Sequence, residues 1–391
     1  MISVSQALEH LFGLVWPTEF EQVDIRQAHG RVLATDAVAK RTQPPFAASA
    51  MDGYAVRAAE ATSGARLSVV GEAAAGHRFA GTLSNGEAVR IFTGAPVPSS
   101  ADSVLIQENG TAEEGYLTVK TSPSVGENIR PAGGDFQSGQ RLEAPRRLTS
   151  RDIALLAAMN VPKVEVHRKP VVALIPTGDE LVLPGEEPGP DQIVTSNNFG
   201  LAAMLEQIGA QPRLCPIARD NSQSLLEALR DAQDADFIVT LGGASVGDHD
   251  LVAEVLGNHG LTLEFYKIAM RPGKPLMAGR IGNATMLGLP GNPVSAMVCG
   301  EIFLRPAVEA AMGLPARPRT ESKTVLAHEL PKNGPREHYM RAALRDDGTC
   351  TVFENQDSSL LGTLSRATAL VIREPNAPLA IKGDNVRCIT L

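Results

Sequence analysis

The spacing of hydrophobic and polar residues predicts two short amphipathic helices in the first half of the chain. Ser3 and Gln6 have the spacing of a capping box, and apolar residues then recur at helical intervals, so we expect a helix over residues 3–14. Thr149 and the acid three residues later repeat this spacing before another apolar face. A second helix is therefore expected over residues 150–159.

Between these helices the pattern changes to short β-type runs separated by turn residues. Asn85-Gly86 precedes an apolar run at 88–92, and Glu114-Gly115 precedes an alternating run at 116–120. The β-rich stretch extends from about residue 23 to residue 145. Helices that bracket a β segment favour a β domain inserted into another domain, whose two halves come before and after it.

Strand-like and helix-like segments alternate between residues 170 and 312. This alternation predicts a doubly wound, mostly parallel sheet covered by helices on both faces. The first strand, 171–175, is wholly apolar and should be buried. The other expected strands are 213–217, 237–240, 263–268, 276–278 and 286–287, and the expected helices are 199–208, 225–232, 251–256 and 293–312.

The last 70 or so residues return to β-type patterning after a proline-rich linker at 315–318. Asp347-Gly348 separates two β-type runs and predicts a hairpin in a small β-barrel or sandwich. The chain is thus read as an α/β plus β, multi-domain protein. The expected units are a discontinuous helical and mixed linker domain (1–43 and 136–168), an inserted β domain (44–135), an α/β domain (169–315) and a C-terminal β-barrel (316–391).

Composition and charge exclude several classes of protein. Hydrophobic residues make up 43% and charged residues 20% of the 391 residues, which argues against disorder and coiled coils. The formal net charge of −8 argues against a nucleic-acid surface. Four scattered cysteines form no CxxC motif, so neither a zinc site nor a disulfide framework is expected. The charge-free stretch 281–300 is broken by glycine and proline, and no secretory signal is visible. We expect a cytoplasmic protein that binds neither membrane nor nucleic acid.

Polar and glycine-rich loops follow three of the expected strands, and ligands of open α/β sheets bind at the carboxyl ends of strands. Residues 177–181 read Thr-Gly-Asp-Glu-Leu. Residues 242–250 combine glycines, a hydroxyl and two carboxylates, a mixture that suits a phosphate with a bridging Mg²⁺. Residues 289–295 place Pro293 at the first turn of a helix, where free N–H groups favour an anion.

Arg271 and Lys274 add two cations in a proline-rich turn, which would neutralise an oxyanion. Each feature alone is compatible with ordinary turn chemistry, and His249 is more typical of a solvated side chain than of a base. Their coincidence at one sheet edge favours a ligand site. No nucleophile elbow, Walker-type P-loop or HExxH motif is present. The residues indicate a Mg²⁺-assisted enzyme for a phosphorylated or nucleotidyl substrate and leave the substrate open.

The three loops, taken in this order, resemble the molybdopterin-binding domain shared by the MogA, MoaB and MoeA families. Residues 49–57 (SAMDGYAVR) and 91–98 (IFTGAPVP) resemble two signatures of MoeA proteins and of the gephyrin E domain, which the short single-domain relatives lack. The turn 271–275 (RPGKP) and the segment 336–341 (REHYMR) also match. Because the resemblance covers nearly the whole chain, the chain is similar to the MoeA family.

This resemblance implies a transferase of molybdenum cofactor biosynthesis. Its substrates would be molybdate and adenylylated molybdopterin, and with Mg²⁺ it would release AMP and molybdenum cofactor. The resemblance also implies an elongated homodimer, with each cleft between the α/β domain of one subunit and the inserted β domain of the other. A MogA-type adenylyltransferase and molybdoenzyme acceptors would be its partners.

The resemblance also implies site residues. Glu180 and Asp250 would be the acids for Mg²⁺ or the pterin, and Asp52 and Thr93 would face them from the inserted domain. The implied substrate-binding residues are Arg130, Asp135, Gly242, Gly243, Ser245, Arg271, Lys274, Pro290, Gly291, Asn292, Pro293 and Ser295.

The chain departs from the MoeA pattern at three places. Arg271 stands where lysine is frequent, Gly134 stands where an acid is common, and residues 357–361 (DSSLL) replace a loop that is usually glycine-rich. Two other functions stay open at this point. One is a MogA-like adenylyltransferase that acts one step earlier, and the other is a gephyrin-like scaffold with secondary chemistry.

Overall fold

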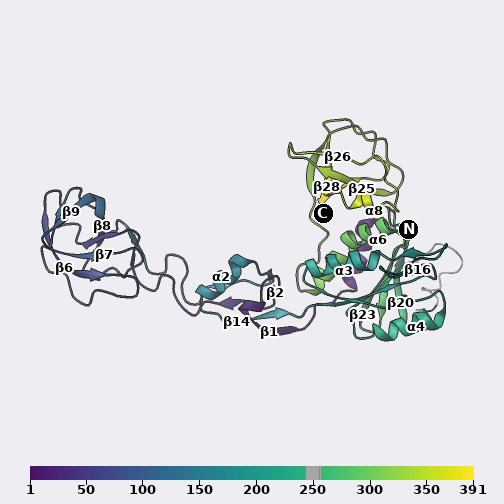
Figure 1. Ribbon diagram of the computed structural model, residues 1–391, viewed down its shortest axis with the longest axis horizontal. Coiled ribbons are helices and arrows are strands. Elements are labelled where there is room, and N and C mark those ends of the chain that lie inside the picture. The colour runs from purple at the N-terminus through teal and green to yellow at the C-terminus, as the bar shows by residue number, and fades with distance from the viewer. Residues whose placement is uncertain (244–254, 256) are drawn as a thin grey trace.

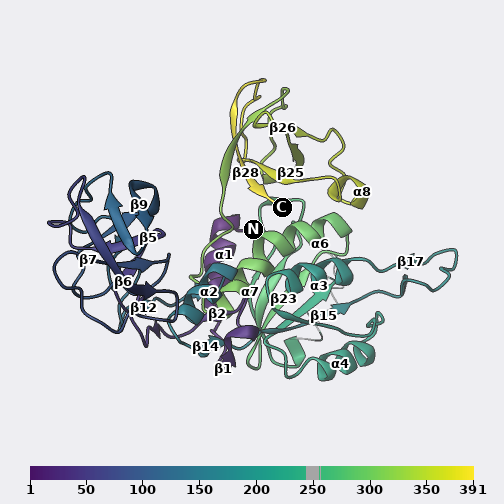
Figure 2. The same ribbon diagram turned by 60° about the vertical axis from the view of Figure 1, so that its left-hand side comes forward.

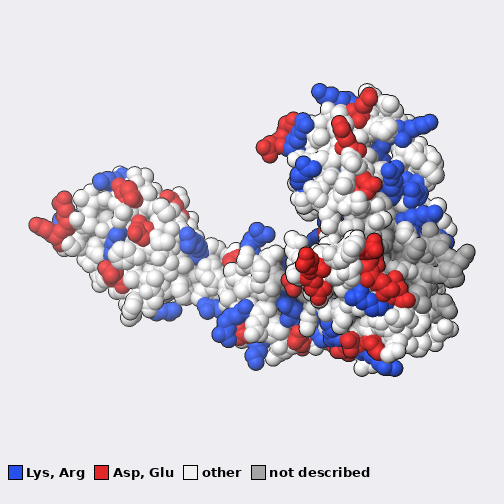
Figure 3. Space-filling view, turned by 45° about the vertical axis from the view of Figure 1, so that its right-hand side comes forward, with Lys and Arg blue, Asp and Glu red and all other residues white. Residues whose placement is uncertain are grey.

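The computed structural model describes residues 1–243, 255 and 257–391, and it forms an elongated molecule (Figure 1). A β lobe lies at one end, a small linker domain lies in the middle, and an α/β domain with a β-barrel above it lies at the other end. The view turned by 60° shows the lobe coming forward beside the linker (Figure 2). Acidic and basic side chains are interspersed over the face shown in Figure 3.

The linker domain is a four-stranded antiparallel sheet in the order β1-β14-β2-β13, covered by helix α2. Thr149 and Asp152 form the expected capping box at the start of α2. The chain leaves for the lobe after β3 and returns through β12, and these two strands pair with each other. The elements are β1 (Phe20–Asp24), the 3₁₀ turn η1 (Ile25–Gln27), β2 (Val32–Leu33), β3 (Ala37–Val38), β12 (Arg141–Leu142), β13 (Arg146–Arg147), α2 (Ser150–Ala158) and β14 (Lys163–His167).

The inserted lobe is a six-stranded sheet in the order β8-β5-β7-β6-β10-β9, with one hydrophobic cluster on each face. Glu114 and Gly115 have positive φ values of 49° and 81° and form the predicted turn between β9 and β10. The turn at Asn85-Gly86 leads into β7, which pairs with β6 in parallel. The elements are β4 (Ala48–Ser49), β5 (Gly53–Val56), β6 (Arg66–Ala73), β7 (Glu87–Ile91), β8 (Ser103–Ile106), η2 (Gln107–Asn109), β9 (Gly110–Glu113), β10 (Tyr116–Val119) and β11 (Ile129–Arg130).

The first helix, α1 (Val4–Gly13), has the predicted capping box of Ser3 and Gln6. Its buried residues belong to the same hydrophobic cluster as the core of the α/β domain. On sequence alone this helix was expected in the linker domain, within residues 1–43. Its apolar face packs on the α/β domain, where it contacts β20 and α7.

The α/β sheet has the order β18-β15-β19-β23-β22-β20, in which the first four strands are parallel, β22 runs antiparallel to them, and β20, which pairs antiparallel with β22, runs in the first direction again. Successive residues of β15 alternate between two cores. Val172 and Leu174 face α3, α6 and α7, and Ala173 and Ile175 face α4. The predicted doubly wound sheet is therefore confirmed.

The long helix expected over residues 293–312 is continuous, with a π-helical segment, η3, in its middle. The helix expected over 251–256 lies almost entirely outside the described residues. The elements of this domain are β15 (Val171–Pro176), β16 (Leu181–Val182), β17 (Ile193–Val194), α3 (Asn197–Gln207), β18 (Gln211–Leu214), α4 (Ser222–Asp231), β19 (Phe237–Leu241), β20 (Leu261–Tyr266), β21 (Met270–Arg271), β22 (Met277–Ile281), β23 (Ala284–Leu289), α6 (Pro293–Cys299), η3 (Gly300–Leu304) and α7 (Arg305–Ala311).

The C-terminal domain is a closed barrel of five strands, because β25 pairs with both β26 and β27. The hairpin predicted at Asp347-Gly348 joins β25 to β26. Strand β21 of the α/β domain pairs in parallel with β25 of the barrel, and this pairing connects the two domains. The elements are β24 (Ser322–Leu326), β25 (Glu337–Leu344), β26 (Thr349–Val352), α8 (Leu361–Leu364), β27 (Ala369–Arg373) and β28 (Asn385–Thr390). Among the described residues, none of the helices combines the length and the apolar composition of a membrane span.

Candidate active site

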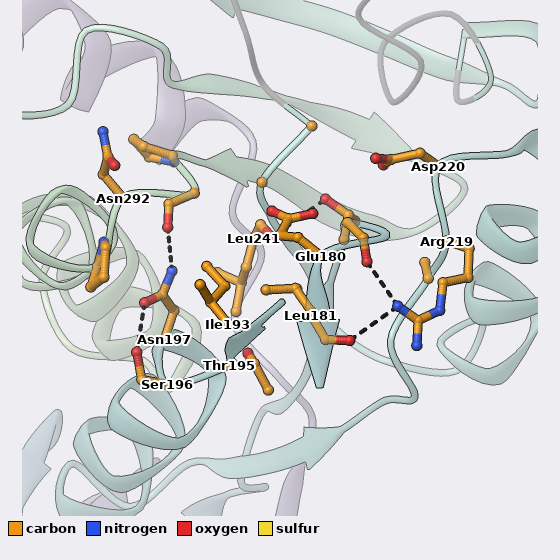
Figure 4. Close-up of a pocket in the computed structure, with 18 of the residues that line it drawn as sticks. Glu180, Leu181, Ile193, Thr195, Ser196, Asn197, Arg219, Asp220, Leu241 and Asn292 are labelled. Atoms are coloured by element: carbon orange, nitrogen blue, oxygen red, sulfur yellow. Dashed lines mark hydrogen bonds between the residues drawn. The ribbon is translucent and has the colours of Figure 1, made fainter. Parts of the chain in front are cut away.

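A cavity of about 830 Å³ opens at the carboxyl edge of the α/β sheet (Figure 4). The loops after β15, β19 and β23 form its floor, as the sequence predicted for three parallel strands. The other described walls come from the segment before α3 and from the loop after β18. The polar residues that line it are Thr177, Glu180, Thr195, Ser196, Asn197, Arg219, Asp220 and Asn292, and the glycines and prolines are Gly178, Gly242, Gly243, Pro275, Pro290, Gly291 and Pro293.

Gly242 allows the strand-end loops to pack against one another. Gly242 has φ +104°, and its N–H donates to the carbonyl of Leu289 at 3.1 Å. A Cβ on Gly242 would lie 2.7 Å from the backbone oxygen of Thr177, so a side chain there would collide with the neighbouring strand end. A Cβ on Gly291 would lie 3.5 Å from Gly242 Cα. The floor of the cavity is therefore backbone brought close together from three strands.

Glu180 supplies a carboxylate that lines this cavity. Its side chain folds back over Gly178, where a Cβ would lie 2.3 Å from Glu180 Oε2. Gly178 has φ +145°, a conformation that favours glycine. Within the described residues, the Glu180 carboxylate has neither a hydrogen bond nor an ion pair. It is an exposed anionic group at the cavity, without a partner among the residues that the structure describes.

Arg219, which the sequence analysis missed, contacts the loop that carries Glu180. Its Nη1 donates to the carbonyl oxygens of Gly178, Asp179 and Leu181 at 3.2, 3.1 and 3.0 Å. Figure 4 shows the guanidinium pointing toward that backbone from the loop after β18. Because ligands of open α/β sheets bind at the carboxyl ends of strands, the position of Arg219 after β18 is the sequence signal that points to it.

The segment before α3 fixes the opposite wall. Asn197 Nδ2 donates to the carbonyl of Gly291 at 2.8 Å, and Ser196 Oγ donates to Asn197 Oδ1 at 3.3 Å (Figure 4). These two residues hold the loop after β23 in place. The sequence analysis missed them because the contact joins segments that are 94 residues apart.

The sequence-predicted residues of the α/β domain fall into three groups. Glu180, Gly242, Gly243, Pro290, Gly291, Asn292 and Pro293 line the cavity. Ser245 and Asp250 lie outside the described residues, as does His249. Ser295, Arg271 and Lys274 are described but are not among the residues that line it.

Ser295 is 4% exposed at the start of α6, and Lys274 is exposed. Arg271 lines a second cavity, of about 380 Å³, between β21 and the barrel. His338 lies in the same second cavity and is buried. Burial lowers the pKa of His338 to about 4, and Arg271 and three further arginines lower it as well. The proline-rich turn therefore contributes Pro275 to the first cavity and Arg271 to the second.

The barrel reaches the first turn of α6 through the atypical 357–361 loop. The N–H of Val294 donates to the carbonyl of Ser358 at 3.0 Å. One of the N–H groups that the sequence analysis expected to be free for an anion is therefore occupied by protein. Asp357 in turn accepts hydrogen bonds from the backbone and hydroxyl of Ser359, which lowers the pKa of Asp357, the hydroxyl being the larger cause.

The inserted lobe brings Asp52 and Thr93 together on its surface. Asp52 Oδ1 accepts hydrogen bonds from the backbone N–H of Thr93 at 2.8 Å and from its hydroxyl at 2.7 Å. The backbone hydrogen bond, followed by the hydroxyl, lowers the pKa of Asp52. Arg130 in β11 pairs with Ala48 of β4, and the N–H of Asp135 donates to the carbonyl of Gln43.

This part of the lobe lies apart from the α/β cavity of the same chain (Figures 1 and 2). Every described residue that lines the cavity belongs to the α/β domain. Within one chain, Asp52 and Thr93 thus form one group on the lobe, and Glu180 belongs to a separate group in the α/β cavity.

The residues present fit a magnesium ion better than a transition metal. Glu180 and Asp220 line the cavity as carboxylates without an ion pair in the described part of the chain. Among the described residues there is no cluster of three or more His, Cys, Asp or Glu side chains. Mg²⁺ commonly takes one or two protein carboxylates and completes its octahedron with water and substrate phosphates.

Comparison with known families places this fold and cavity in one class. Residues 2–160 match the MoeA N-terminal region (domain I and II), residues 173–310 match a probable molybdopterin-binding domain, and residues 323–391 match the MoeA C-terminal region (domain IV). The doubly wound α/β domain, the inserted β lobe and the closed barrel together define the class of multidomain proteins of the MoeA type.

Sequence comparison with individual proteins identifies the family within this class. A molybdopterin molybdenumtransferase of Nostoc is 38% identical over 100% of this chain and 94% of its own length. The enzyme of the same name from Haemophilus influenzae is 36% identical over 80% of this chain and 78% of its own length. The chain belongs to the MoeA family, transferases of molybdenum cofactor biosynthesis.

Solved structures agree with this assignment. A molybdopterin biosynthesis MoeA protein of Pyrococcus horikoshii superposes with a TM-score of 0.85 at 29% identity, over 100% of this chain and 99% of that chain. A second structure of such a protein from the same organism gives a TM-score of 0.88 at 26% identity, over 100% of both chains.

Proposed function

We propose that this chain inserts molybdate into adenylylated molybdopterin in the α/β cavity and releases AMP and molybdenum cofactor. The observation that carries the proposal is the carboxylate of Glu180, unpaired within the described part of the chain, in a cavity of about 830 Å³ bounded by three strand-end loops. That volume lies within the usual range of ligand pockets. Membership of the MoeA family supports the same reaction.

The residues of the cavity would share the work of binding. Close-packed glycine backbone admits the substrate phosphates near the strand ends, and the prolines keep the rim rigid. Glu180 and, on the sequence resemblance, Asp250 would hold Mg²⁺, which when bound supplies positive charge that stabilises the developing charge on the leaving AMP. Ser245, Lys274 and Ser295 are proposed for the oxyanion side on the same resemblance.

The second half of the site would come from another copy of the chain. Asp52, Thr93, Arg130 and Asp135 lie on a lobe that is remote from the cavity of the same chain. A homodimer of the proposed kind brings this surface over the partner's cavity. The anionic Asp52, held by Thr93, would then orient polar groups of the substrate from the open side.

The cytoplasm is the proposed location. There a MogA-type adenylyltransferase would supply the substrate, and molybdoenzymes would accept the product.

The direct test is an anaerobic assay of AMP release from adenylylated molybdopterin, with and without molybdate. The proposal predicts molybdate-dependent release that requires Mg²⁺ and exceeds a no-protein control. Release that ignores molybdate, or none at all, would contradict it. ATP-dependent adenylylation of free molybdopterin would instead favour the adenylyltransferase function.

A further inference from the structure

The backbone on both sides of Glu180 is held by the side chain of Arg219 together with main-chain groups of neighbouring segments. Four consecutive carbonyls, those of residues 178–181, accept hydrogen bonds. Arg219 Nη1 donates to three of them, and the N–H of Ile193 donates to the carbonyl of Glu180 at 2.8 Å. Arg219 Nη1 carries two hydrogens, which are shared among three carbonyl acceptors. The contact therefore restrains the backbone of residues 178–181.

Neighbours of Arg219 fasten the same loop a second time. The N–H of Asp220 donates to Asp179 Oδ1 at 3.1 Å, and the N–H of Gly178 donates to the carbonyl of Ala218 at 3.0 Å. The loop after β18 therefore contacts the loop after β15 through both backbone and side chains. Arg219 is the only cationic side chain among these described contacts.

The acceptors that the Arg219 guanidinium contacts determine whether it pairs with the Glu180 carboxylate. A guanidinium in the same cavity would normally pair with a nearby carboxylate, and an Arg–carboxylate pair would neutralise the ligand. In this structure the guanidinium donates to carbonyl oxygens, and it forms no ion pair with Glu180. The carboxylate is thereby left available to a cation.

We propose that Arg219 is a positioning residue, which fixes the peptide groups on both sides of Glu180 and so directs its carboxylate into the cavity. This inference rests on the proposed function, in which Glu180 holds Mg²⁺. Groups that orient a metal ligand typically change metal affinity by about 10–100-fold when they are removed. A positioning role therefore changes the Mg²⁺ requirement more than the maximal rate.

The experiment compares Arg219→Ala and Arg219→Lys with the control Arg213→Ala. Arg213 lies in β18, close in sequence to Arg219, but its guanidinium pairs with Asp234, with Nη2 and Oδ2 3.0 Å apart. Three quantities are measured: the Mg²⁺ concentration that gives half-maximal AMP release, kcat at saturating Mg²⁺, and hydrogen exchange of the Gly178 and Ile193 amides.

We expect Arg219→Ala to raise the half-maximal Mg²⁺ concentration about tenfold or more, with kcat at saturation reduced less than about threefold. The Gly178 and Ile193 amides should exchange faster than in the parent protein. Arg219→Lys keeps a positively charged hydrogen-bond donor but lacks the planar guanidinium. It should therefore show smaller changes in the half-maximal Mg²⁺ concentration and in amide exchange. Arg213→Ala should show neither change.

A lowered kcat with an unchanged Mg²⁺ requirement, or unchanged exchange of both amides in Arg219→Ala and Arg219→Lys, would overturn the inference. If Arg219→Ala does not fold, Arg219→Lys carries the same test. Glu180→Gln separates this inference from the proposed function. If Glu180→Gln leaves the Mg²⁺ requirement unchanged, the metal assignment fails, whereas the exchange rates still decide whether Arg219 positions the loop.

Discussion

The two acids expected on opposite sides of the site, Asp52 and Glu180, are held in opposite ways. Asp52 Oδ1 accepts two hydrogen bonds from Thr93, and its pKa is lowered as a result. The Glu180 carboxylate has no hydrogen-bond partner among the described residues, while the backbone beneath it is clamped by Arg219. The lobe therefore fixes a charged side chain directly, and the cavity fixes the backbone and leaves the side chain open to a ligand.

The difference in how the two carboxylates are held indicates different roles for Asp52 and Glu180. A carboxylate that is already satisfied stays ionised and rigid, and it is suited to orienting a substrate. A carboxylate with no protein partner in an open cavity is suited to receiving a cation.

The largest effect is expected from Glu180→Gln. The amide retains the shape but cannot neutralise a bound cation, so kcat/KM for AMP release should fall about 100-fold or more. Glu187→Gln is the matched control, because Glu187 is exposed on the same segment and makes no hydrogen bond or ion pair within the described residues. Equal activity of Glu180→Gln and Glu187→Gln would remove Glu180 from the site.

A smaller effect is expected from Gly178→Ala. The new Cβ would lie 2.3 Å from Glu180 Oε2 and would push the carboxylate out of place, so activity should fall about tenfold. Gly185→Ala is the control, since Gly185 also has positive φ, +97°, but has open space around it. Both variants should lose about 1–2 kcal/mol of unfolding free energy, measured by denaturant titration, and only Gly178→Ala should lose activity. If Gly178→Ala and Gly185→Ala lose activity to the same extent, backbone strain and not displacement of the Glu180 carboxylate explains the loss.

The smallest effect is expected from Thr93→Val, which removes the hydroxyl donor and retains the backbone N–H. The pKa of Asp52 should rise only part of the way to its ordinary value, because the backbone hydrogen bond is the larger cause of its lowering. A lowered pKa in the folded state adds stability above the unfolded pKa, and that stability is lost as the pH falls through the folded pKa. The acid unfolding midpoint should therefore move slightly upward.

An NMR titration of the Asp52 carboxyl carbon measures this shift. An unchanged pKa in Thr93→Val would show that the hydroxyl does not contribute to holding Asp52.

Local sequence signals predicted much of the fold. Both capping boxes, the hairpin turns at Glu114-Gly115 and Asp347-Gly348, the parallel strands and the C-terminal barrel are confirmed. These features depend on residues close in sequence or on a regular period, so a single chain displays them.

The features that sequence did not predict depend on contacts between distant segments. The packing of α1 on the α/β sheet needs an apolar partner far along the chain, and amphipathicity does not say which one. Arg219 reaches a loop about 40 residues earlier in the chain. Arg271 was expected with Lys274 at the sheet edge, but β21 joins the barrel strand β25 and takes Arg271 to the second cavity.

We propose that one site is built from the α/β cavity of one chain and the lobe of another. AMP release by a mixture of Glu180→Gln and Asp52→Asn proteins after subunit exchange measures this directly. In a symmetric dimer, half of the exchanged dimers would contain one intact site and one doubly altered site, so activity should recover to about a quarter of that of the parent protein. If verified exchange gives no activity beyond that of the two variants measured separately, the two acids do not meet across a dimer and the account is wrong.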